Sequence, residues 1–364
     1  MIVASMSTIP ERKEHFKGLV KRILSEQTLP VDKLFVCLHR YGSINPDLPS
    51  DPRIEYSLSK PNQGPWVRYA VAEKLADDDV LATLDDDTNY PTNYFKKGVS
   101  DLQRVGNNAV VCYGGLRWNP LIDSFAYSGP ERTLVLGYSK LQRDFRVSFL
   151  QGICSFMRAR DAKGAIDLIL PGFNTNDDMM ISYHLQRTGR TIYCCVKDAG
   201  WITATEDAVA PHALFMRDGD TRQETFRRMV YELGFDPTAG WMEELTRVQR
   251  HIVVLAREIP LLSNDPSLHE SVIRLCAEDR LVHVVAPVKS SQLAEVERFA
   301  DLPYLVHPSA VPEGGRRFDA LTLIRKSRAR NLDTLSHKTW DRRLNAILTK
   351  LPHAQIVDWR DGKP

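Results

Sequence analysis

The chain has 364 residues, of which 43% are hydrophobic and 26% are charged, and its formal net charge is +2 at pH 7. This balance is typical of a folded globular protein, not of a disordered or fibrous one, and the small charge argues against a dedicated nucleic-acid-binding protein. The length exceeds what one compact domain usually needs, so two domains are expected.

Short apolar runs alternate with helical patterns over residues 1–245, which predicts an α/β layer fold. The predicted strands are the runs 2–6, 33–38, 53–58, 80–84, 109–113, 149–157 and 190–196. The predicted helices cover 14–26, 64–75, the segment after Pro91, 177–186 and 221–233. The segment 118–144 is rich in Gly, Pro and Tyr and is predicted to be a loop that faces substrate.

The α/β pattern restarts after Trp241, which predicts a first domain over 1–245 and a second, smaller α/β domain over 246–364. Its predicted strands are 251–256, 281–286, 304–307 and 356–359, and its predicted helices are 267–277, 292–299, 318–332 and 340–351. The helix over 318–332 is basic and amphipathic. Either it contacts anionic lipid or a phosphate-bearing acceptor at the membrane periphery, or it is a solvated helix face.

The sequence predicts a cytoplasmic protein without a transmembrane segment. Its first residues lack the basic region of a secretory signal, and no apolar stretch approaches the roughly 20 residues that cross a bilayer. The six cysteines are scattered and form no C-x-x-C pair. They are therefore expected to be reduced and mostly buried, not to form disulfides or a zinc site.

Three aspartates, Asp85, Asp86 and Asp87, directly follow the apolar run 80–84. Side chains alternate along an extended chain, so Asp85 and Asp87 are expected on one side and Asp86 on the other. Two carboxylates at the C-terminal end of a strand suit Mg²⁺ or Mn²⁺, which completes its coordination with water and substrate phosphates. The alternative is a solvated acidic turn.

Several motifs in this order resemble family 2-like GT-A glycosyltransferases, above all a bacterial branch with a Ser-Thr-Ile-Pro-x-Arg turn and an Asp-Asp-Asp form of the D-x-D motif. The turn is 7–12 and the D-x-D motif is 85–87. The resemblance covers about residues 1–240, and its other segments are 89–91, 115–118, 149–152, 176–178 and 213–228. It implies a Rossmann-like mixed sheet flanked by helices.

The resemblance implies a site for a nucleotide-sugar donor. In that family the turn after the first strand lines the nucleotide pocket, which implies that Thr8, Pro10 and Arg12 lie near the base or the phosphates. The D-x-D side chains reach the metal and the donor ribose. By this resemblance Asp85 faces the ribose and also the metal.

The same resemblance assigns Asp87 to the metal, a Mn²⁺ or Mg²⁺ ion, and leaves Asp86 between the ribose and metal roles. A histidine late in the fold often completes the metal shell in that family, and His212 is the nearest candidate. The family's helix-initial acidic pair supplies the catalytic base. Here the pair is Asp177–Asp178, with Asp178 in the usual position of the base, although acidic pairs in a first helical turn are also common without any catalytic role.

Three further residues are candidates for the donor site, each with a plain structural alternative. Trp118 is expected either to stack on a sugar ring or the base, or to be an ordinary half-buried aromatic residue. Gln151–Gly152 is expected either to let the backbone approach the donor sugar or to be a kink in a strand, because glycine permits close contact.

The resemblance predicts an enzyme that moves a sugar from a nucleotide-sugar donor to a hydroxyl of a carbohydrate or lipid-linked acceptor, with inversion, in bacterial surface polysaccharide synthesis. One alternative is a sugar nucleotidyltransferase, but such enzymes usually carry a glycine-rich phosphate loop after the first strand, and this chain has no glycine before Gly18. The other alternative is a binding module that keeps the fold without turnover. The sequence leaves the oligomeric state open.

Overall fold

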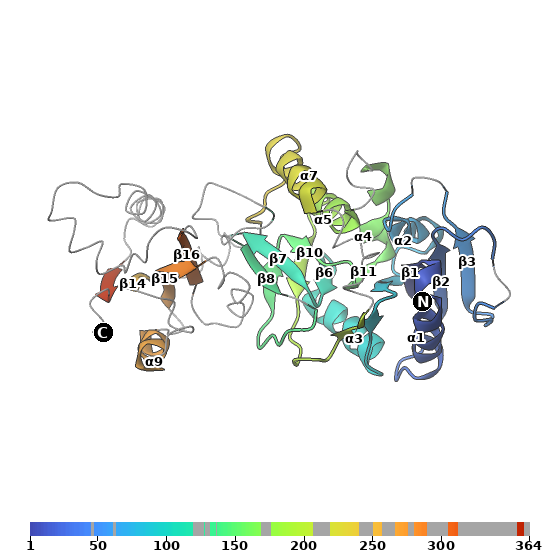
Figure 1. The fold of residues 1–364 in the computed structure, drawn as a ribbon, viewed down its shortest axis with the longest axis horizontal. Helices are drawn as coiled ribbons and strands as arrows, with labels where there is room; N and C mark the ends of the chain where they lie inside the picture. Colours follow the sequence, from blue (N-terminus) through green and yellow to red (C-terminus); the bar gives the residue numbers. More distant parts are fainter. Residues whose placement is uncertain are drawn as a thin grey trace. The chain divides into compact units, whose positions relative to one another are not determined.

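The computed structural model describes residues 1–44, 47–60, 63–118, 127, 132–135, 137–168, 176–206, 219–239, 250–256, 266–275, 280–289, 305–311 and 355–359. The chain forms two compact units, residues 1–117 with 135–240 and residues 118–134 with 241–364. Both have the predicted α/β class, and the first is built on a large mixed sheet flanked by helices (Figure 1). The domain boundary predicted at residue 245 lies outside the described residues.

The main sheet of the first unit has eight strands in the order β3-β2-β1-β4-β11-β6-β12-β9. The first four are mutually parallel, whereas β11 runs antiparallel to both of its neighbours and β9 antiparallel to β12. The strands are β1 (Ile2–Thr8), β2 (Lys33–Leu38), β3 (Ile54–Leu58), β4 (Val80–Asp85), β6 (Ala109–Cys112), β9 (Phe145–Val147), β11 (Cys154–Arg158) and β12 (Thr191–Cys194).

Helices cover both faces of this sheet, with α1 and α3 on one face and α2, α4 and α5 on the other (Figure 1). The helical elements are η1 (Pro10–Arg12), α1 (Lys13–Ser25), α2 (Val67–Ala70), η2 (Val71–Lys74), α3 (Tyr94–Val105), α4 (Ala159–Ala162), η3 (Ala165–Leu168), α5 (Asp177–Arg187) and α7 (Gly219–Tyr231). The helix predicted over 64–75 is in fact the two short elements α2 and η2. Aromatic and β-branched residues, which have low helix propensity, are frequent at its start.

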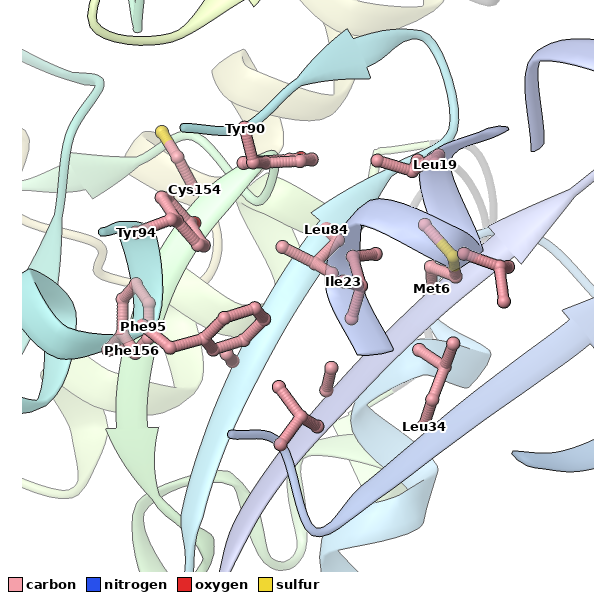
Figure 2. Packing of buried hydrophobic residues seen from close by; sticks show 14 of the residues in the cluster. Met6, Leu19, Ile23, Leu34, Leu84, Tyr90, Tyr94, Phe95, Cys154 and Phe156 are labelled. Carbon is pink, nitrogen blue, oxygen red and sulfur yellow. The ribbon is translucent and has the colours of Figure 1, made fainter. Parts of the chain in front are cut away.

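A core of buried apolar side chains joins α1 and α3 to the sheet (Figure 2). The apolar face predicted for α1 is confirmed, because Phe16, Leu19 and Ile23 are all buried. Beside α3, the rings of Tyr94 and Phe156 lie 5.0 Å apart between centroids. Burying side chains of this size contributes about 1.5–3 kcal/mol each, so this core fixes the position of the parallel strands.

The strand predicted over 149–157 is interrupted. Its first part, β10 (Phe149–Leu150), pairs with β7 (Gly115–Trp118) in a small sheet that also contains β8 (Arg132–Val135). Its second part is β11 of the main sheet, and Gln151 and Gly152 lie in the break between them. The short pair β5 (Thr88–Asn89) and β13 (Thr203–Ala204) is antiparallel.

The second unit contains a four-stranded parallel sheet in the order β16-β15-β14-β17. Its elements are β14 (Arg250–Ala256), α9 (Pro266–Leu275), β15 (Arg280–Lys289), β16 (Leu305–Val311) and β17 (Gln355–Trp359), so the four predicted strands and the first predicted helix are confirmed. The helices predicted over 292–299, 318–332 and 340–351 lie outside the described residues.

Two further predictions, on membrane-spanning segments and on the cysteines, can be compared with the described part of the structure. In the part of the chain that the structure describes, no helix is both long and apolar enough to cross a bilayer. The five cysteines in that part are buried, as predicted, and each carries a free thiol; they are Cys37, Cys112, Cys154, Cys194 and Cys195.

Candidate active site

The predicted site residues gather where β1 and β4 end. The parallel register pairs Ser7 of β1 with Asp85 of β4, so the turn after β1 lies beside the aspartate triplet. Strand β4 ends at Asp85, and the chain turns through Asp86 and Asp87 into β5. The side-chain alternation of an extended strand therefore stops at Asp85. For this reason the three carboxylates depart from the expected arrangement, which had Asp85 and Asp87 on one side and Asp86 on the other.

Asp86 and Asp87 share one arginine. The two terminal nitrogens of Arg12, in η1, lie 2.6 Å from Oδ1 of Asp86 and 2.9 Å from Oδ2 of Asp87. Asp86 is only 4% exposed, and burial raises its pKa although Arg12 opposes the shift. Burial and the neighbouring charge of Asp85 raise the pKa of Asp87 to about 7, again with Arg12 opposing. Burial and the repulsion between neighbouring carboxylates therefore outweigh the effect of Arg12 on the pKa of both residues.

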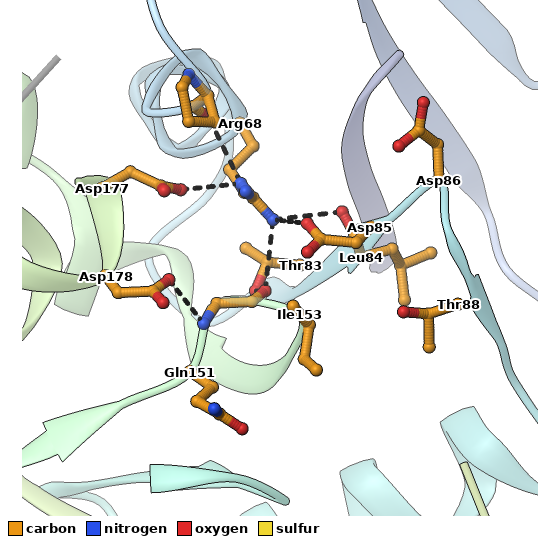
Figure 3. A network of polar contacts seen from close by, with 12 residues as sticks. Arg68, Thr83, Leu84, Asp85, Asp86, Thr88, Gln151, Ile153, Asp177 and Asp178 are labelled. Atoms are coloured by element: carbon orange, nitrogen blue, oxygen red, sulfur yellow. Dashed lines mark hydrogen bonds and ion pairs between the residues drawn. The ribbon is translucent and has the colours of Figure 1, made fainter. Parts of the chain in front are cut away.

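Asp85 is bound instead by Arg68 of α2, a side chain that the sequence analysis did not single out (Figure 3). Nη1 of Arg68 lies 2.5 Å from Oδ1 of Asp85, and Nε lies 2.8 Å from Oδ2 of Asp177 at the start of α5. Burial alone would lower the pKa of Arg68, but Asp177 and Asp85 outweigh it and keep the guanidinium protonated. One cation thus connects the aspartate triplet with the acidic pair of α5.

Asp178, the expected base, lies beside this network. Its Oδ1 accepts a hydrogen bond of 2.7 Å from the backbone N–H of Gly152 (Figure 3). Burial and the adjacent Asp177 raise the pKa of Asp178 to about 7, partly offset by Arg68. A carboxylate that titrates near neutral pH is well matched to proton transfer.

The surrounding site residues leave no room for a side chain at Gly152. A Cβ at this position would lie 2.6 Å from Oδ1 of Asp178 and 2.9 Å from the hydroxyl of Tyr69, closer than non-bonded atoms approach. The carbonyl of Gly152 accepts a 2.6 Å hydrogen bond from the hydroxyl of Thr83 in β4. The side-chain oxygen of the neighbouring Gln151 is buried and has no hydrogen-bond partner among the described residues.

Further buried polar atoms surround the ends of β1 and β2. Ser7 Oγ, His39 Nε2 and Trp66 Nε1 have no hydrogen-bond partner within the described residues. Burial first, and then the charges of Arg68 and Arg40, lower the pKa of His39 to about 4, so this imidazole is neutral at pH 7. Buried polar groups normally find partners, so these atoms are candidates to meet a ligand.

The turn after β2 is also strained. Arg40 has a φ of 61°, the left-handed region that favours glycine, and its guanidinium pairs with Glu11 at 2.8 Å. Residues held in such conformations cluster at ligand sites. His39 directly follows the predicted strand 33–38, but no motif in the sequence marks it as a site residue.

The remaining predicted residues are placed as follows. Thr8 ends β1 and is buried, and Pro10 begins η1, so both lie in the turn beside the aspartate triplet. Trp118 is fully buried in β7, deeper than the half-buried position expected if it were an ordinary aromatic residue. His212 lies outside the described residues.

Within the described ranges, no three His, Cys, Asp or Glu side chains are arranged to hold a metal ion by themselves. Asp85 and Asp87 are the two partly exposed carboxylates of the triplet, with 24% and 15% of their side chains accessible. Among the described residues, a divalent cation at this site would therefore have these two carboxylates as ligands, with further oxygen ligands from a bound substrate.

Comparison with known proteins does not show a family. No protein-family model matches the chain, and no curated protein does. Among solved structures, 121 chains are similar. One of them, described as a glucose-1-phosphate thymidylyltransferase from Bacillus anthracis in complex with a sucrose, is 10% identical over 60% of this chain and 94% of its own, with a TM-score of 0.33. A likeness this low carries no argument about activity, so the functional conclusion depends on the geometry of the site.

Proposed function

We propose that the chain is a glycosyltransferase of the GT-A type that moves a sugar from a nucleotide-sugar donor to an acceptor hydroxyl. The observation that carries this proposal is the position of Asp178. A carboxylate with a pKa near 7 lies in the same network as the aspartate triplet, through Asp177 and Arg68. Donor binding and deprotonation of the acceptor therefore have candidate residues a few side chains apart at one sheet edge.

The donor nucleotide is proposed to lie along the turn after β1. Thr8, Pro10 and Arg12 are the residues implied by the family resemblance, and Ser7 and His39 add buried polar atoms without protein partners in the described part of the chain. Arg12 is directed at the aspartate triplet, where a diphosphate and its cation would bind. Guanidinium groups suit this task because their planar fork matches phosphate oxygens.

A Mn²⁺ or Mg²⁺ ion fits this site as a ligand brought together with the donor. Asp85 and Asp87 supply hard oxygen ligands, and burial together with the neighbouring charge of Asp85 raises the pKa of Asp87 to about 7. When bound, the cation would act as a Lewis acid that neutralises charge on the departing diphosphate. Asp86 is buried against Arg12, so we propose that it orients Arg12.

Asp178 is proposed to remove the proton from the acceptor hydroxyl. Its Oδ1 is held by the N–H of Gly152, which fixes the carboxylate and leaves Oδ2 as the oxygen to accept the proton. General-base catalysis of this kind contributes about 10²–10⁴-fold. A single base on the acceptor side predicts inversion at the anomeric carbon, as does the family resemblance.

A sugar nucleotidyltransferase is the competing enzyme class. Such enzymes usually bind phosphates in a glycine-rich loop after the first strand, whereas here β1 leads into the 3₁₀ helix Pro10–Arg12 and the first glycine, Gly18, lies inside α1. The acceptor, a carbohydrate or lipid-linked hydroxyl in bacterial surface polysaccharide synthesis, and the cytoplasmic location stay predictions of the sequence.

The proposal is tested by calorimetric titration of UDP-, GDP-, CMP- and TDP-sugars, with Mn²⁺ or Mg²⁺ and again with EDTA. Metal-dependent binding of one donor class, followed by release of the nucleoside di- or monophosphate in the presence of acceptor sugars, supports a glycosyltransferase. Release of pyrophosphate from a nucleoside triphosphate and a sugar 1-phosphate would instead identify a nucleotidyltransferase. Binding without any turnover would favour the non-catalytic module.

A further inference from the structure

Arg68 pairs with carboxylates of both halves of the site, Asp85 from β4 and Asp177 from α5 (Figure 3). The side chains of Arg68 and Asp177 are 6% and 7% exposed, so water screens this pair little. Asp85 is more accessible, at 24%. A ligand can therefore reach Asp85, whereas it cannot reach Asp177 directly.

Backbone carbonyls hold the guanidinium in place between the two carboxylates. Nη1 of Arg68 donates to the carbonyls of Leu84 and Gly152, at 3.2 and 3.4 Å, and Nε donates to the carbonyl of Pro65 at 3.2 Å. The guanidinium therefore stays close to both carboxylates whichever of them it pairs with more strongly. Asp85 and Asp177 share one positive charge.

Asp178 is connected to the same charge in two ways. Its neighbour Asp177 pairs with Arg68. Gly152, whose N–H donates a hydrogen bond to Asp178, also accepts a hydrogen bond from Arg68 through its carbonyl. Anything that changes how strongly Arg68 binds Asp177 also changes the electrostatic surroundings of Asp178. Arg222 of α7 also acts electrostatically on Asp177.

We propose that Arg68 is a positioning residue that transmits the occupancy of Asp85 to the acidic pair Asp177–Asp178. A nucleotide and cation bound at Asp85 take over that carboxylate, and Arg68 then pairs more fully with Asp177. The inference rests on the proposed function in one respect, namely that a nucleotide ligand binds at Asp85. It adds that ligand binding at the donor site changes the electrostatic surroundings of the base, Asp178, before the acceptor hydroxyl is deprotonated.

Coupling between two sites is reciprocal, so a change at Asp177 should alter the affinity of the ligand that binds at Asp85. If ligand binding at Asp85 releases Arg68 to Asp177, removal of the Asp177 charge leaves the released guanidinium without that partner. Asp177→Asn should then weaken ligand binding by about 5-fold or more, although Asp177 does not touch the ligand. The direct loss of a nearby negative charge would also weaken binding of a cation, so the single variant does not decide the matter.

A double-mutant cycle separates the two causes. The dissociation constant of UDP is measured by calorimetry with saturating Mn²⁺ for the wild type, Asp177→Asn, Arg68→Gln and the double variant, with GDP, CDP and dTDP as further probes. We expect Asp177→Asn to weaken binding in the wild-type background and to have little effect in the Arg68→Gln background. Asp101→Asn is the matched control, because Asp101 is a buried helix carboxylate that pairs with Arg104 away from this network.

Equal effects of Asp177→Asn in both backgrounds would overturn the inference, because Arg68 would then transmit nothing. If Arg68→Gln does not fold, Arg68→Lys replaces it; a lysine ammonium is a point charge that cannot bind two carboxylates in a fork, so the effect of Asp177→Asn should be clearly reduced. An undiminished effect with lysine again overturns the inference. Failure of every nucleoside diphosphate to bind the wild type overturns the proposed function and this inference together, whereas ligand binding with no effect of Asp177→Asn overturns the inference alone.

Discussion

The backbone N–H of Gly152 donates a 2.7 Å hydrogen bond to Oδ1 of Asp178, which ties the break between β10 and β11 to the first turn of α5. The carbonyl of the same glycine accepts a hydrogen bond from Thr83 in β4. One peptide segment thus sets the distance between the strand that carries the aspartate triplet and the helix that carries the candidate base. Gly152 can make this contact with Asp178 because the strand predicted over 149–157 is interrupted at this residue.

Gly152→Ala should therefore lower activity strongly while leaving the fold in place. The added Cβ would lie 2.6 Å from Oδ1 of Asp178 and 2.9 Å from the Tyr69 hydroxyl, so the base must move. A shift of about 1 Å in a catalytic group costs on the order of 100-fold in rate. We expect this loss in kcat, with a melting temperature only a few degrees lower. Gly18→Ala is the control, because no atom lies within 4 Å of a Cβ there and helix propensity predicts a small gain in stability.

Much of this fold is predictable from local pattern. The parallel strands and α1 were located by apolar runs and helical spacing, because their side chains are buried on the faces that the pattern indicates. The short strands β5, β7 and β13 were not, because runs of two to four residues carry no periodicity of their own. The break after β10 depends on partners distant in the chain.

The candidate site was predictable only in part for a related reason. The triplet 85–87 and the pair 177–178 stand out in the sequence as clustered acidic residues, but the link between them is Arg68, which pairs with one carboxylate of each. A single arginine in an unremarkable helical segment carries no local signal. His39 is likewise identified only by its buried, unpartnered nitrogen, which is a property of the packed structure.

Arg12→Met should destabilise the protein. Its removal leaves Asp86, a 5% exposed carboxylate, without the guanidinium that pairs with it at 2.6 Å. Removing one partner of a buried ion pair typically costs about 3–5 kcal/mol, because the other charge stays buried. The double variant Arg12→Met/Asp86→Asn should recover most of that loss, as measured by urea unfolding. A double variant no more stable than Arg12→Met would show that Asp86 is not what makes Arg12 necessary.

Asp87→Asn should separate binding of the cation from the integrity of the fold. Asp87 is partly exposed and crowded by Asp85, so loss of its charge relieves repulsion in the protein while it removes an oxygen ligand for the cation. We expect the ratio of the nucleotide affinity with Mn²⁺ to the affinity with EDTA to fall by at least about 10-fold. Three further aspartates, residues 77–79, precede β4. Asp77→Asn should leave this ratio unchanged, because Asp77 pairs with Lys163 at the surface.

The rate should depend on pH through Asp178. Burial and Asp177 raise the pKa of Asp178 to about 7, and a general base acts only when it is deprotonated. The wild-type kcat should therefore fall about tenfold per pH unit below pH 7 and level off above it. Asp178→Asn should lower kcat by about 10²–10⁴-fold and keep donor affinity nearly unchanged. A retained rate in this variant would exclude Asp178 as the base.

Asp178 should also cost stability at high pH. The unfolded chain releases this proton near pH 4, whereas the folded protein holds it to about pH 7, so the free energy of unfolding falls as the pH rises across that window. Asparagine has no such titration. Asp178→Asn should therefore melt at a higher temperature than the wild type at pH 8, and the difference should shrink at pH 5. A lower melting temperature of the variant at pH 8 would mean that the hydrogen bond from Gly152 stabilises the anion by more than burial beside Asp177 destabilises it.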